Sequence, residues 1–152
     1  MQEFLMLLHK YCVKYLIIGG EAVIYYGYPR LTGDMDIFYE NSAENIGNLF
    51  KMLDEFWDGN IPEIENIEEL AKPGLIVQFG VPPNRIDLLN KITNIEFSKA
   101  WGNRKVETIK FNKNMIPIYY IGLDELIKNK KAVNRPKDME DLKYLERRKG
   151  NR

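Results

Sequence analysis

Two periodicities run through the hydrophobic and polar positions of the chain, and together they predict a mixture of helices and strands. Apolar residues recurring every three to four positions predict helices over Gln2–Val13, Glu21–Tyr26, Ala43–Phe56, Ile95–Trp101, Leu123–Val133 and Pro136–Arg148. Short apolar or alternating runs predict strands over Tyr15–Ile18, Leu75–Val81, Arg85–Leu89, Lys105–Phe111 and Met115–Ile121, with a further strand opening at Asp34. Ser42 and Asn66 are expected to cap helices, the second of them a short helix that ends at Ala71.

The length of 152 residues favours one domain, because a chain of this size buries about two-thirds of its unfolded surface. We expect a sheet-containing core over residues 1–121 and a C-terminal helix pair over residues 122–149. The composition is that of an ordinary globular protein, with 45% hydrophobic and 29% charged residues. The sequence therefore predicts a single domain over residues 1–152.

The cysteine, the histidine and the N-terminal residues indicate in which compartment the protein is expected and which kinds of site it lacks. Cys12 is the one cysteine, which excludes an internal disulfide and fits a reducing cytosol. His9 is the one histidine, so no Cys/His set for zinc is present, and we expect His9 to be a surface residue. The apolar run Phe4–Leu8 is too short for a signal peptide or a membrane span. We expect a soluble, cytoplasmic protein.

Charge is unevenly distributed, although the formal net charge is zero. Residues 1–103 hold 8 basic and 15 acidic side chains, whereas residues 104–152 hold 14 basic and 7 acidic ones. A basic C-terminal half of this kind is typical of solvated helices. The alternative is a basic wall that faces an acidic metal cluster and attracts a polyphosphate or a nucleic acid. Charge alone does not separate the two interpretations.

Candidate chemistry is concentrated in the first quarter of the chain. Gly19 and Gly20 follow an apolar strand, and after thirteen further residues Asp34 and Asp36 begin the next strand. Acids at i and i+2 of a strand point to one face, with Cα atoms roughly 6.5–7 Å apart. Two carboxylates so placed can bracket one divalent cation, or two cations about 3.5–4 Å apart. Because glycines let a phosphate approach backbone N–H groups, the pattern predicts a metal-and-phosphate site.

A third acid, Asp87, stands alone in a later apolar strand. Ile86 and Leu88 share one face of that strand, while Arg85, Asp87 and Leu89 share the other. A lone acid in a strand often marks an exposed face. Here, however, Asp87 could join the two acids of the earlier strand in one site. The glycines match neither the GxxxxGK[ST] P-loop nor the GxGxxG dinucleotide turn. The ordered combination is more specific than any of its parts.

This combination resembles the nucleotidyltransferase superfamily, whose fold is shared by kanamycin nucleotidyltransferase and the palm of DNA polymerase beta. The family pattern is a hydrophobic residue with Gly-Gly or Gly-Ser, a spacer, Asp-h-Asp/Glu-h and a later h-Asp-h, where h is hydrophobic. The matching segments are Ile18-Gly19-Gly20, Asp34-Met35-Asp36-Ile37 and Ile86-Asp87-Leu88. The resemblance implies a two-layer α+β fold, in which a mixed β-sheet carries helices packed on one face and is followed by the C-terminal helix pair.

Within the superfamily, residues 13–148 look closest to the small bacterial branch near the AbiEii-type toxins of toxin–antitoxin systems. That branch carries Arg-x-Thr-x-Asp-h-Asp, matched by Arg30, Thr32, Asp34 and Asp36. Its C-terminal helices have a lysine before an Arg/Lys-Asp-x-x-Asp-Leu stretch, matched by Lys130 (with Lys131 as the alternative), Lys137-Asp138 and Asp141-Leu142. The helix dipole alone is an alternative reason for the two acids in this stretch. Gly20 departs from the branch, since many AbiEii-type toxins have serine there.

The resemblance implies a Mg²⁺-dependent nucleotidyltransferase that moves an NMP from an NTP to an acceptor hydroxyl and releases pyrophosphate. Its catalytic acids, and the ligands of two Mg²⁺ or alternatively Mn²⁺ ions, would be Asp34, Asp36 and Asp87, with Asp87 also orienting or deprotonating the acceptor. The residues expected to bind the nucleotide are Gly19, Gly20, Arg30, Thr32 and Lys130. The acceptor stays open between a tRNA, a protein and a small molecule. An antitoxin protein is a further expected partner, and no membrane is expected.

Two other classes of function stay open. A non-catalytic module of the same fold would bind a nucleotide or a protein partner, although the intact set of three acids argues against it. A nucleic-acid-binding protein would use the basic C-terminal half, but no helix-turn-helix, RNP or zinc-finger pattern supports this class. We expect Tyr25, Tyr26 and Tyr28 to be core or loop aromatics instead of base readers.

Overall fold

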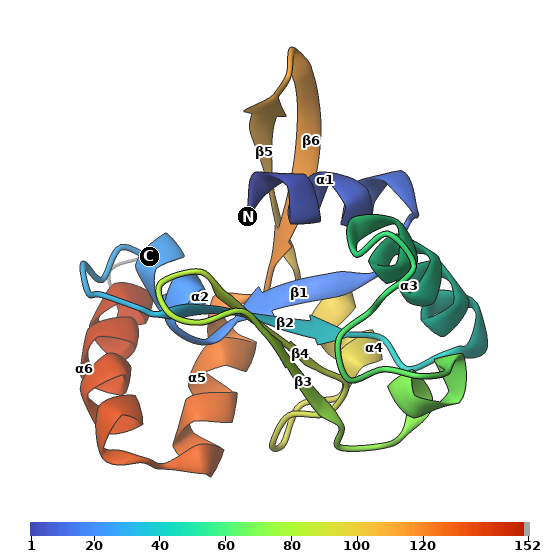
Figure 1. Cartoon of the computed structure of the whole chain (residues 1–152). Helices are drawn as coiled ribbons and strands as arrows, with labels where there is room; N and C mark the ends of the chain where they lie inside the picture. Colours follow the sequence, from blue (N-terminus) through green and yellow to red (C-terminus); the bar gives the residue numbers. More distant parts are fainter. Residues whose placement is uncertain (151–152) are drawn as a thin grey trace.

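The computed structural model describes residues 1–150, which are organised by a mixed sheet of six strands (Figure 1). The strands are β1 (Tyr15–Ile18), β2 (Asp34–Tyr39), β3 (Ile76–Phe79), β4 (Arg85–Leu89), β5 (Lys105–Phe111) and β6 (Asn114–Tyr120). The helices are α1 (Gln2–Lys10), α2 (Gly19–Tyr25), α3 (Ala43–Phe56), α4 (Phe97–Gly102), α5 (Leu123–Val133) and α6 (Pro136–Gly150), with a 3-10 helix η1 at Ile67–Ala71. None of the described helices is long and apolar enough to span a membrane. The expected α+β class with a mixed sheet is confirmed.

The strand order β3-β4-β2-β1-β6-β5 makes neighbours of segments that are distant in sequence. β1 is antiparallel to β2 and parallel to β6. β2 and β4 are parallel, a pairing that needs a long crossover, made here by α3, η1 and β3. Their register places Asp36 beside Asp87 and Asp34 beside Arg85. This single pairing brings the predicted acids onto adjacent strands.

One face of the sheet is covered by α1 and α3 and holds the larger apolar cluster. Alternation along β1 directs Tyr15 and Ile17 to this face, where they are 0% and 1% exposed. Phe4 of α1 and Leu49 of α3 belong to the same cluster and are fully buried. Full burial of a large apolar side chain contributes about 1.5–3 kcal/mol, so this layer anchors the sheet.

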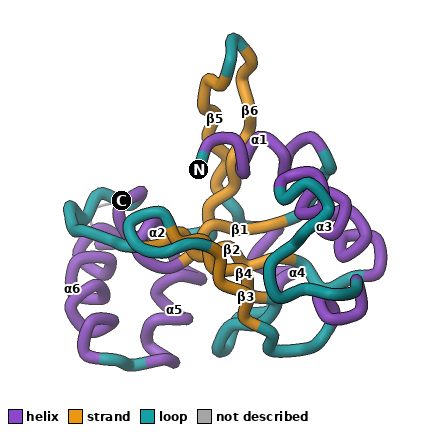
Figure 2. The backbone as a smooth tube through the Cα atoms, in the orientation of Figure 1, coloured by secondary structure: helices purple, strands orange, loops and turns teal. Residues whose placement is uncertain are grey.

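The opposite face receives Leu16 and Ile18 and carries a second apolar cluster, to which α2, α4, α5 and α6 contribute residues. Helices α5 and α6 lie next to each other beside the sheet (Figure 2). Val23 of α2 and Leu126 of α5 are fully buried there. Helices thus pack on both faces of the sheet, one layer more than the one-sided arrangement expected from the sequence. The physical reason lies in β1, which is buried at every position, so both of its faces need a cover.

Local signals account for most of the element boundaries. Ser42 caps α3, as predicted, by accepting a hydrogen bond from the backbone N–H of Asn45 at 3.3 Å. Asn66 opens η1 through a reciprocal capping box with Glu69. The main difference is at α2, which begins at Gly19, so the two glycines form its first turn instead of preceding it.

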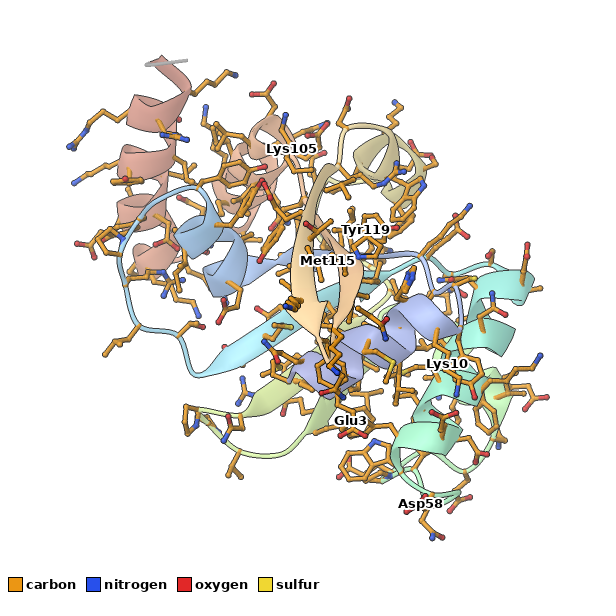
Figure 3. The ribbon with its side chains drawn as sticks, turned by 90° about the horizontal axis from the view of Figure 1, so that it is seen from above. Glu3, Lys10, Asp58, Lys105, Met115 and Tyr119 are labelled. Atoms are coloured by element: carbon orange, nitrogen blue, oxygen red, sulfur yellow. The ribbon has the colours of Figure 1, made fainter. Side chains whose placement is uncertain are left out.

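The β5–β6 hairpin extends away from the rest of the sheet (Figure 1). β6 pairs with β1 through Tyr120 and Ile17, at the end of the strand that leads into α5. Seen from above, α1 lies beside β6, the hairpin strand that carries Met115 and Tyr119 (Figure 3). Met115 is 61% exposed, whereas Ile116 and Ile118 of the same strand are buried, so only one face of this strand packs against the rest of the protein.

Candidate metal and nucleotide site

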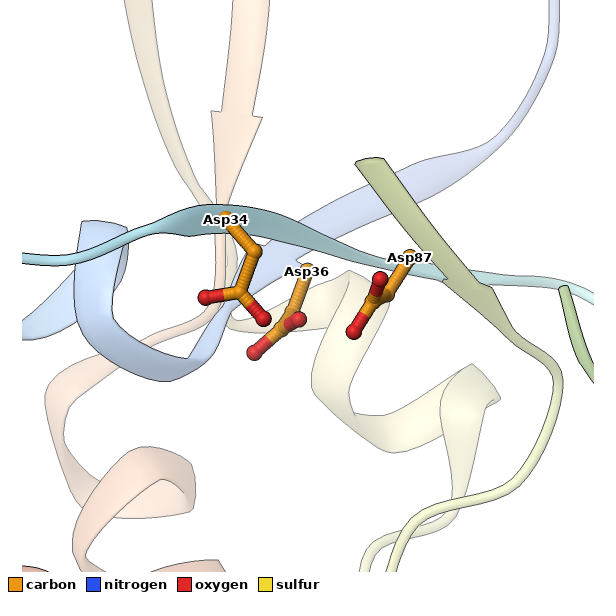
Figure 4. A group of neighbouring side chains, drawn as sticks. All are labelled: Asp34, Asp36 and Asp87. Atoms are coloured by element: carbon orange, nitrogen blue, oxygen red, sulfur yellow. The ribbon is translucent and has the colours of Figure 1, made fainter. Parts of the chain in front are cut away.

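Three aspartates converge on one face of the sheet, two from β2 and one from β4 (Figure 4). Alternation along β2 turns Asp34 and Asp36 to this face, while Met35 joins the core on the other side. The parallel register then places Asp87 beside Asp36. One carboxylate oxygen from each aspartate lies within 4.8 Å of the other two. The predicted proximity of Asp87 to the acid pair is therefore observed.

Arg85 and Gln78 provide hydrogen-bond donors to two of the aspartates, Asp34 and Asp87. Arg85 Nη2 donates to Asp34 Oδ2 at 2.6 Å, and Arg85 Nε lies 3.0 Å from Asp87 Oδ1. Gln78 lies beside Asp87 on β3 and donates from Nε2 to Asp87 Oδ2 at 3.4 Å. The sequence predicts Arg85 on the same face as Asp87 but assigns it no role, because the sequence does not show that β4 pairs with β2 in the register that brings Arg85 beside Asp34.

The carboxylates differ in their electrostatic environment. Burial raises the pKa of Asp36 to about 7, and the charges of Asp34 and Asp87 add to the increase. Desolvation also raises the pKa of Asp34, but the hydrogen bond and the charge of Arg85 outweigh it, so the net shift of this pKa is downward. Asp36 is thus the carboxylate whose ionisation the surroundings oppose most, and an added cation would favour its charged form.

Gly19 and Gly20 form a close wall of the site at the start of α2. Gly19 has a φ of +64°, and a Cβ at this position would collide with the carboxylate of Asp36. A Cβ at Gly20 would lie 2.7 Å from Oγ1 of Thr32, which donates to the backbone carbonyl of Asp34 at 3.1 Å. The serine that many AbiEii-type toxins carry at this position would therefore require Thr32 to shift.

A buried ion cluster joins Arg30 to the C-terminal helix pair. Arg30 Nη2 donates to Asp141 Oδ2 at 3.2 Å, and Lys130 Nζ lies 3.0 Å from the same oxygen. Lys130 Nζ also lies 3.1 Å from Asp138 Oδ1, and Arg135 Nε donates to Asp138 Oδ2 at 2.8 Å. Asp138 and Asp141 are 0% and 2% exposed. Their role in α6 therefore goes beyond complementing the helix dipole.

Lys130 and its alternative, Lys131, lie in different environments. Lys131 is exposed and pairs with Glu146 at 3.0 Å, whereas Lys130 is 4% exposed and lines the cleft that holds the aspartates. Desolvation raises the pKa of Asp138, but hydrogen bonds from Arg135 and Lys130 outweigh it and bring this pKa down to about 2. Because carboxylates already engage Lys130, its predicted contact with phosphate stays a prediction.

The aspartates lie in a cleft of about 880 Å³, within the roughly 300–1,000 Å³ typical of small-molecule sites. Basic residues of its lining are Arg30, Arg85, Lys91, Lys130, Arg135 and Lys137. Apolar side chains of its lining include Leu31, Ile76, Leu89 and Ile92. The basic C-terminal half therefore contributes to the cleft through Lys130, Arg135 and Lys137, in addition to solvated positions such as Lys149.

The tyrosines of the loop region pack away from this cleft. Tyr25 stacks on Tyr120 with ring centroids 4.0 Å apart, and Tyr28 stacks on Tyr144 at 4.8 Å. Tyr26 is 7% exposed and donates its hydroxyl to the carbonyl of Ile121. The expectation that they are core or loop aromatics is confirmed.

The donor set fits a hard divalent cation. Mg²⁺ and Mn²⁺ prefer carboxylate oxygens, and here three carboxylates offer oxygens at close range. Burial, and after it the negative charges of Asp34 and Asp87, raise the pKa of Asp36, and a bound cation would offset both effects. The residues present therefore fit the predicted metal, while the identity and the number of ions stay predictions.

Comparison with known proteins supports the superfamily drawn from the motifs. A family model described as "Nucleotidyltransferase of unknown function (DUF6036)" matches residues 1–146. No curated protein matches the chain significantly. The resemblance to the nucleotidyltransferase superfamily is thereby confirmed, whereas the AbiEii-type branch stays a prediction.

Proposed function

The chain belongs to a family of nucleotidyltransferases of unknown function, and on that basis we propose that it transfers an NMP from an NTP to an acceptor hydroxyl. In this reaction the acceptor oxygen forms a bond to the α-phosphorus, the bond from that phosphorus to the bridging oxygen breaks, and pyrophosphate leaves. The proton of the hydroxyl passes to a carboxylate or to water.

The observation that carries the proposal is the convergence of three carboxylates, from two strands, beside a glycine turn and inside a cleft. A pair of acids is sufficient to hold a cation, and the third supplies a group that can also act on an acceptor. A module that only binds a nucleotide has no need of this third acid. The complete set therefore favours catalysis.

Asp34 and Asp36 would hold divalent cations between β2 and the cleft. Bound Mg²⁺ would neutralise the triphosphate and stabilise the charge that develops during transfer. Asp87 would share this cation and orient or deprotonate the acceptor hydroxyl, a role that suits its place beside Asp36. Gln78, which donates to Asp87, would keep this carboxylate turned toward the cleft.

The leaving phosphates would lie against Gly19 and Gly20, which line the cleft; Gly19 is half-buried and Gly20 is buried, so Gly19 offers the more accessible backbone. Arg30 lines the same cleft and is fixed by Asp141, so it is positioned to contact a phosphate oxygen. Thr32 would support this wall from behind Asp34. We assign Lys130 to the same end of the cleft, as the cation that holds Asp141 in place.

A finer proposal is that the protein acts as an AbiEii-like toxin with an antitoxin protein as partner. It is supported by the spacing of Arg30, Thr32, Asp34 and Asp36, and by the contact between Arg30 and Asp141 that links this segment to α6. Induced expression in bacteria should then arrest growth, and the arrest should disappear with Asp36→Ala. Normal growth with the active wild-type protein would contradict the toxin assignment alone.

The main test uses each of the four NTPs labelled at the α-phosphate, incubated with the protein, Mg²⁺ and a cell lysate. We expect label to appear in one class of macromolecule or small molecule, which identifies the acceptor as a tRNA, a protein or an antibiotic-like compound. Asp36→Ala should reduce labelling by at least about 10³-fold, because it removes a ligand of the reacting centre.

Asp54→Ala is the matched control, since Asp54 is an exposed acid of α3, the helix that covers the other face of the sheet. It should label as the wild type does. Full labelling by Asp36→Ala would place the chemistry elsewhere. Metal-dependent NTP binding without pyrophosphate release would instead identify a non-catalytic module of the same fold.

A further inference from the structure

Arg85 is held at the centre of the acid site by the pairing of two strands. On β4 it lies two residues before Asp87 and on the same face, and on β2 its partner in register is Asp34. The neighbouring register pair is Asp36 and Asp87, whose carboxylates appear side by side in Figure 4. Three acids and one guanidinium therefore form a compact quartet on one face of the sheet.

The guanidinium contacts two of the three acids. Arg85 Nη2 lies 2.6 Å from Asp34 Oδ2 and 3.3 Å from Asp87 Oδ2, while Arg85 Nε lies 3.0 Å from Asp87 Oδ1. Thr32 Oγ1 donates to the remaining oxygen, Asp34 Oδ1, at 3.3 Å. Both oxygens of Asp34 and Oδ2 of Asp87 thus accept hydrogen bonds from this chain, whereas Asp87 Oδ1 lies buried beside Arg85 Nε without a hydrogen bond.

A divalent cation held by Asp34 and Asp87 would draw on the same two carboxylates as Arg85. Mg²⁺ binds carboxylate oxygens at about 2.0–2.1 Å, closer than the guanidinium approaches them. A cation in that position would also lie next to the positive charge of Arg85, in a part of the cleft where Arg85 is only 30% exposed and screening by water is reduced. Metal and guanidinium therefore compete for Asp34 and Asp87.

We propose that Arg85 is a resident counter-cation, which holds Asp34 and Asp87 together in the metal-free protein and is displaced from Asp34 when a divalent cation binds. Arg85 is in this sense a positioning residue that sets the affinity of the site for metal. The proposal rests on the metal site of the proposed function, but it does not depend on nucleotidyl transfer taking place.

The displaced guanidinium has a second use within the same cleft. Arg85 lines the cleft, and arginine binds phosphate oxygens through two parallel hydrogen bonds. A triphosphate would therefore offer Arg85 new partners in place of Asp34. Metal and NTP should accordingly bind more tightly together than either binds alone, and removal of Arg85 should weaken this coupling.

The test is a titration of the full chain with Mn²⁺ in the absence of nucleotide, followed by electron paramagnetic resonance of the free ion. Arg85→Gln should bind Mn²⁺ about tenfold more tightly than the wild type, because a competing positive charge is removed. Lys91→Gln is the matched control, since Lys91 is an exposed cation that lines the same cleft. It should leave the Mn²⁺ affinity within about twofold of the wild type.

Arg85→Gln with unchanged or weaker Mn²⁺ binding would overturn the proposal, as would the absence of Mn²⁺ binding in both proteins. Circular dichroism reports whether the variant folds. If it does not, Arg85→Met keeps an unbranched side chain but removes the positive charge, and it should bind Mn²⁺ more tightly than the wild type. An unchanged affinity of this second variant would then overturn the proposal. A protein that passes this test yet transfers no nucleotide would refute the proposed function alone.

Discussion

Asp36 is the residue at which the requirements of folding and of metal binding conflict most directly. It is held on β2 between Asp34 and the start of α2, and Gly19 packs against its carboxylate. Burial and the two neighbouring acids raise its pKa to about 7, well above the usual value for aspartate. The metal-free protein therefore keeps a carboxylate that is poorly suited to its surroundings but well suited to a cation.

This conflict predicts how stability depends on pH in the presence of EDTA. Because the pKa of Asp36 is higher in the folded than in the unfolded state, the folded protein binds more protons between about pH 4 and pH 7. The contribution of Asp36 to stability is therefore lost as the pH rises through this window. Asp36→Asn cannot ionise, so its free energy of unfolding should exceed that of the wild type by on the order of 2 kcal/mol at pH 8, and by less at pH 5.

Urea denaturation at pH 5 and at pH 8 measures this difference. Asp34 and Asp138 have lowered pKa values, so the stability they contribute is lost only at acid pH, outside this window. Parallel changes in wild type and Asp36→Asn between the two pH values would show that Asp36 ionises freely in the folded protein.

Gly19 offers a second test at the same scale. Gly19→Ala would place a methyl group against the Asp36 carboxylate at a backbone φ that favours glycine, and should cost about 1–3 kcal/mol of stability. Mn²⁺ affinity should fall as well, because Asp36 must move. Gly47→Ala is the control, since a Cβ at Gly47 meets no neighbouring atom and the helix α3 should gain about 0.5–1 kcal/mol. Thermal melting with and without Mn²⁺ reports both effects, and an unaltered Mn²⁺ response in Gly19→Ala would contradict the close packing of this wall.

At the scale of elements, the α5–α6 pair is attached to the cleft by buried charges. Lys130 from α5 meets Asp138 and Asp141 from α6, and Asp141 in turn holds Arg30 from the loop before β2. Buried ion pairs of this kind are costly to break, because the removal of one partner leaves a charge without compensation. The pair of helices therefore fixes the position of a cleft residue as well as covering the sheet.

Adjacent lysines of α5 should respond very differently to substitution. Lys130→Met should reduce the free energy of unfolding by about 3–5 kcal/mol, since it leaves Asp138 and Asp141 short of a partner. Lys131→Gln removes only an exposed pair with Glu146 and should change stability by less than about 1 kcal/mol. Urea denaturation of the two variants measures the contrast, and equal losses would contradict the buried cluster.

The sequence predicted the elements better than it predicted their contacts. The bounds of β1, α3, β4, β5 and α5 agree with the expected ranges, because apolar periodicity and turn residues are local properties. The start of α2 at Gly19 was not predicted, because two consecutive glycines predict a turn and the sequence does not show that Gly19, at a positive φ, begins the helix.

Contacts that depend on strand register were not open to the same reasoning. The three acids were identified from a motif, but Asp87 reaches Asp36 only through the parallel pairing of β2 and β4. The same register places Arg85 beside Asp34, and no local sequence pattern predicts the contact between these two residues. Arg135 and Lys137 likewise enter the cleft through the packing of the final helices, a long-range feature.

At the scale of the whole molecule, the sheet presents acids to a cleft in which the other charged lining residues are basic. Acids from residues 34–87 and the basic residues Lys130, Arg135 and Lys137 from the last third of the chain, far apart in sequence, meet at this cleft. Such an arrangement suits a ligand that carries both cations and phosphates, because each part finds opposite charge. An NTP with its divalent cations has this composition.

A crystal structure of the protein with Mn²⁺ and a non-hydrolysable NTP tests this account most directly, since anomalous scattering locates the ions. The account predicts Mn²⁺ bounded by the carboxylates of Asp34, Asp36 and Asp87, with Arg85 moved away from Asp34 and the triphosphate directed toward Gly19 and Gly20. Mn²⁺ or nucleotide bound outside this cleft, with the aspartates still paired to Arg85, would contradict it.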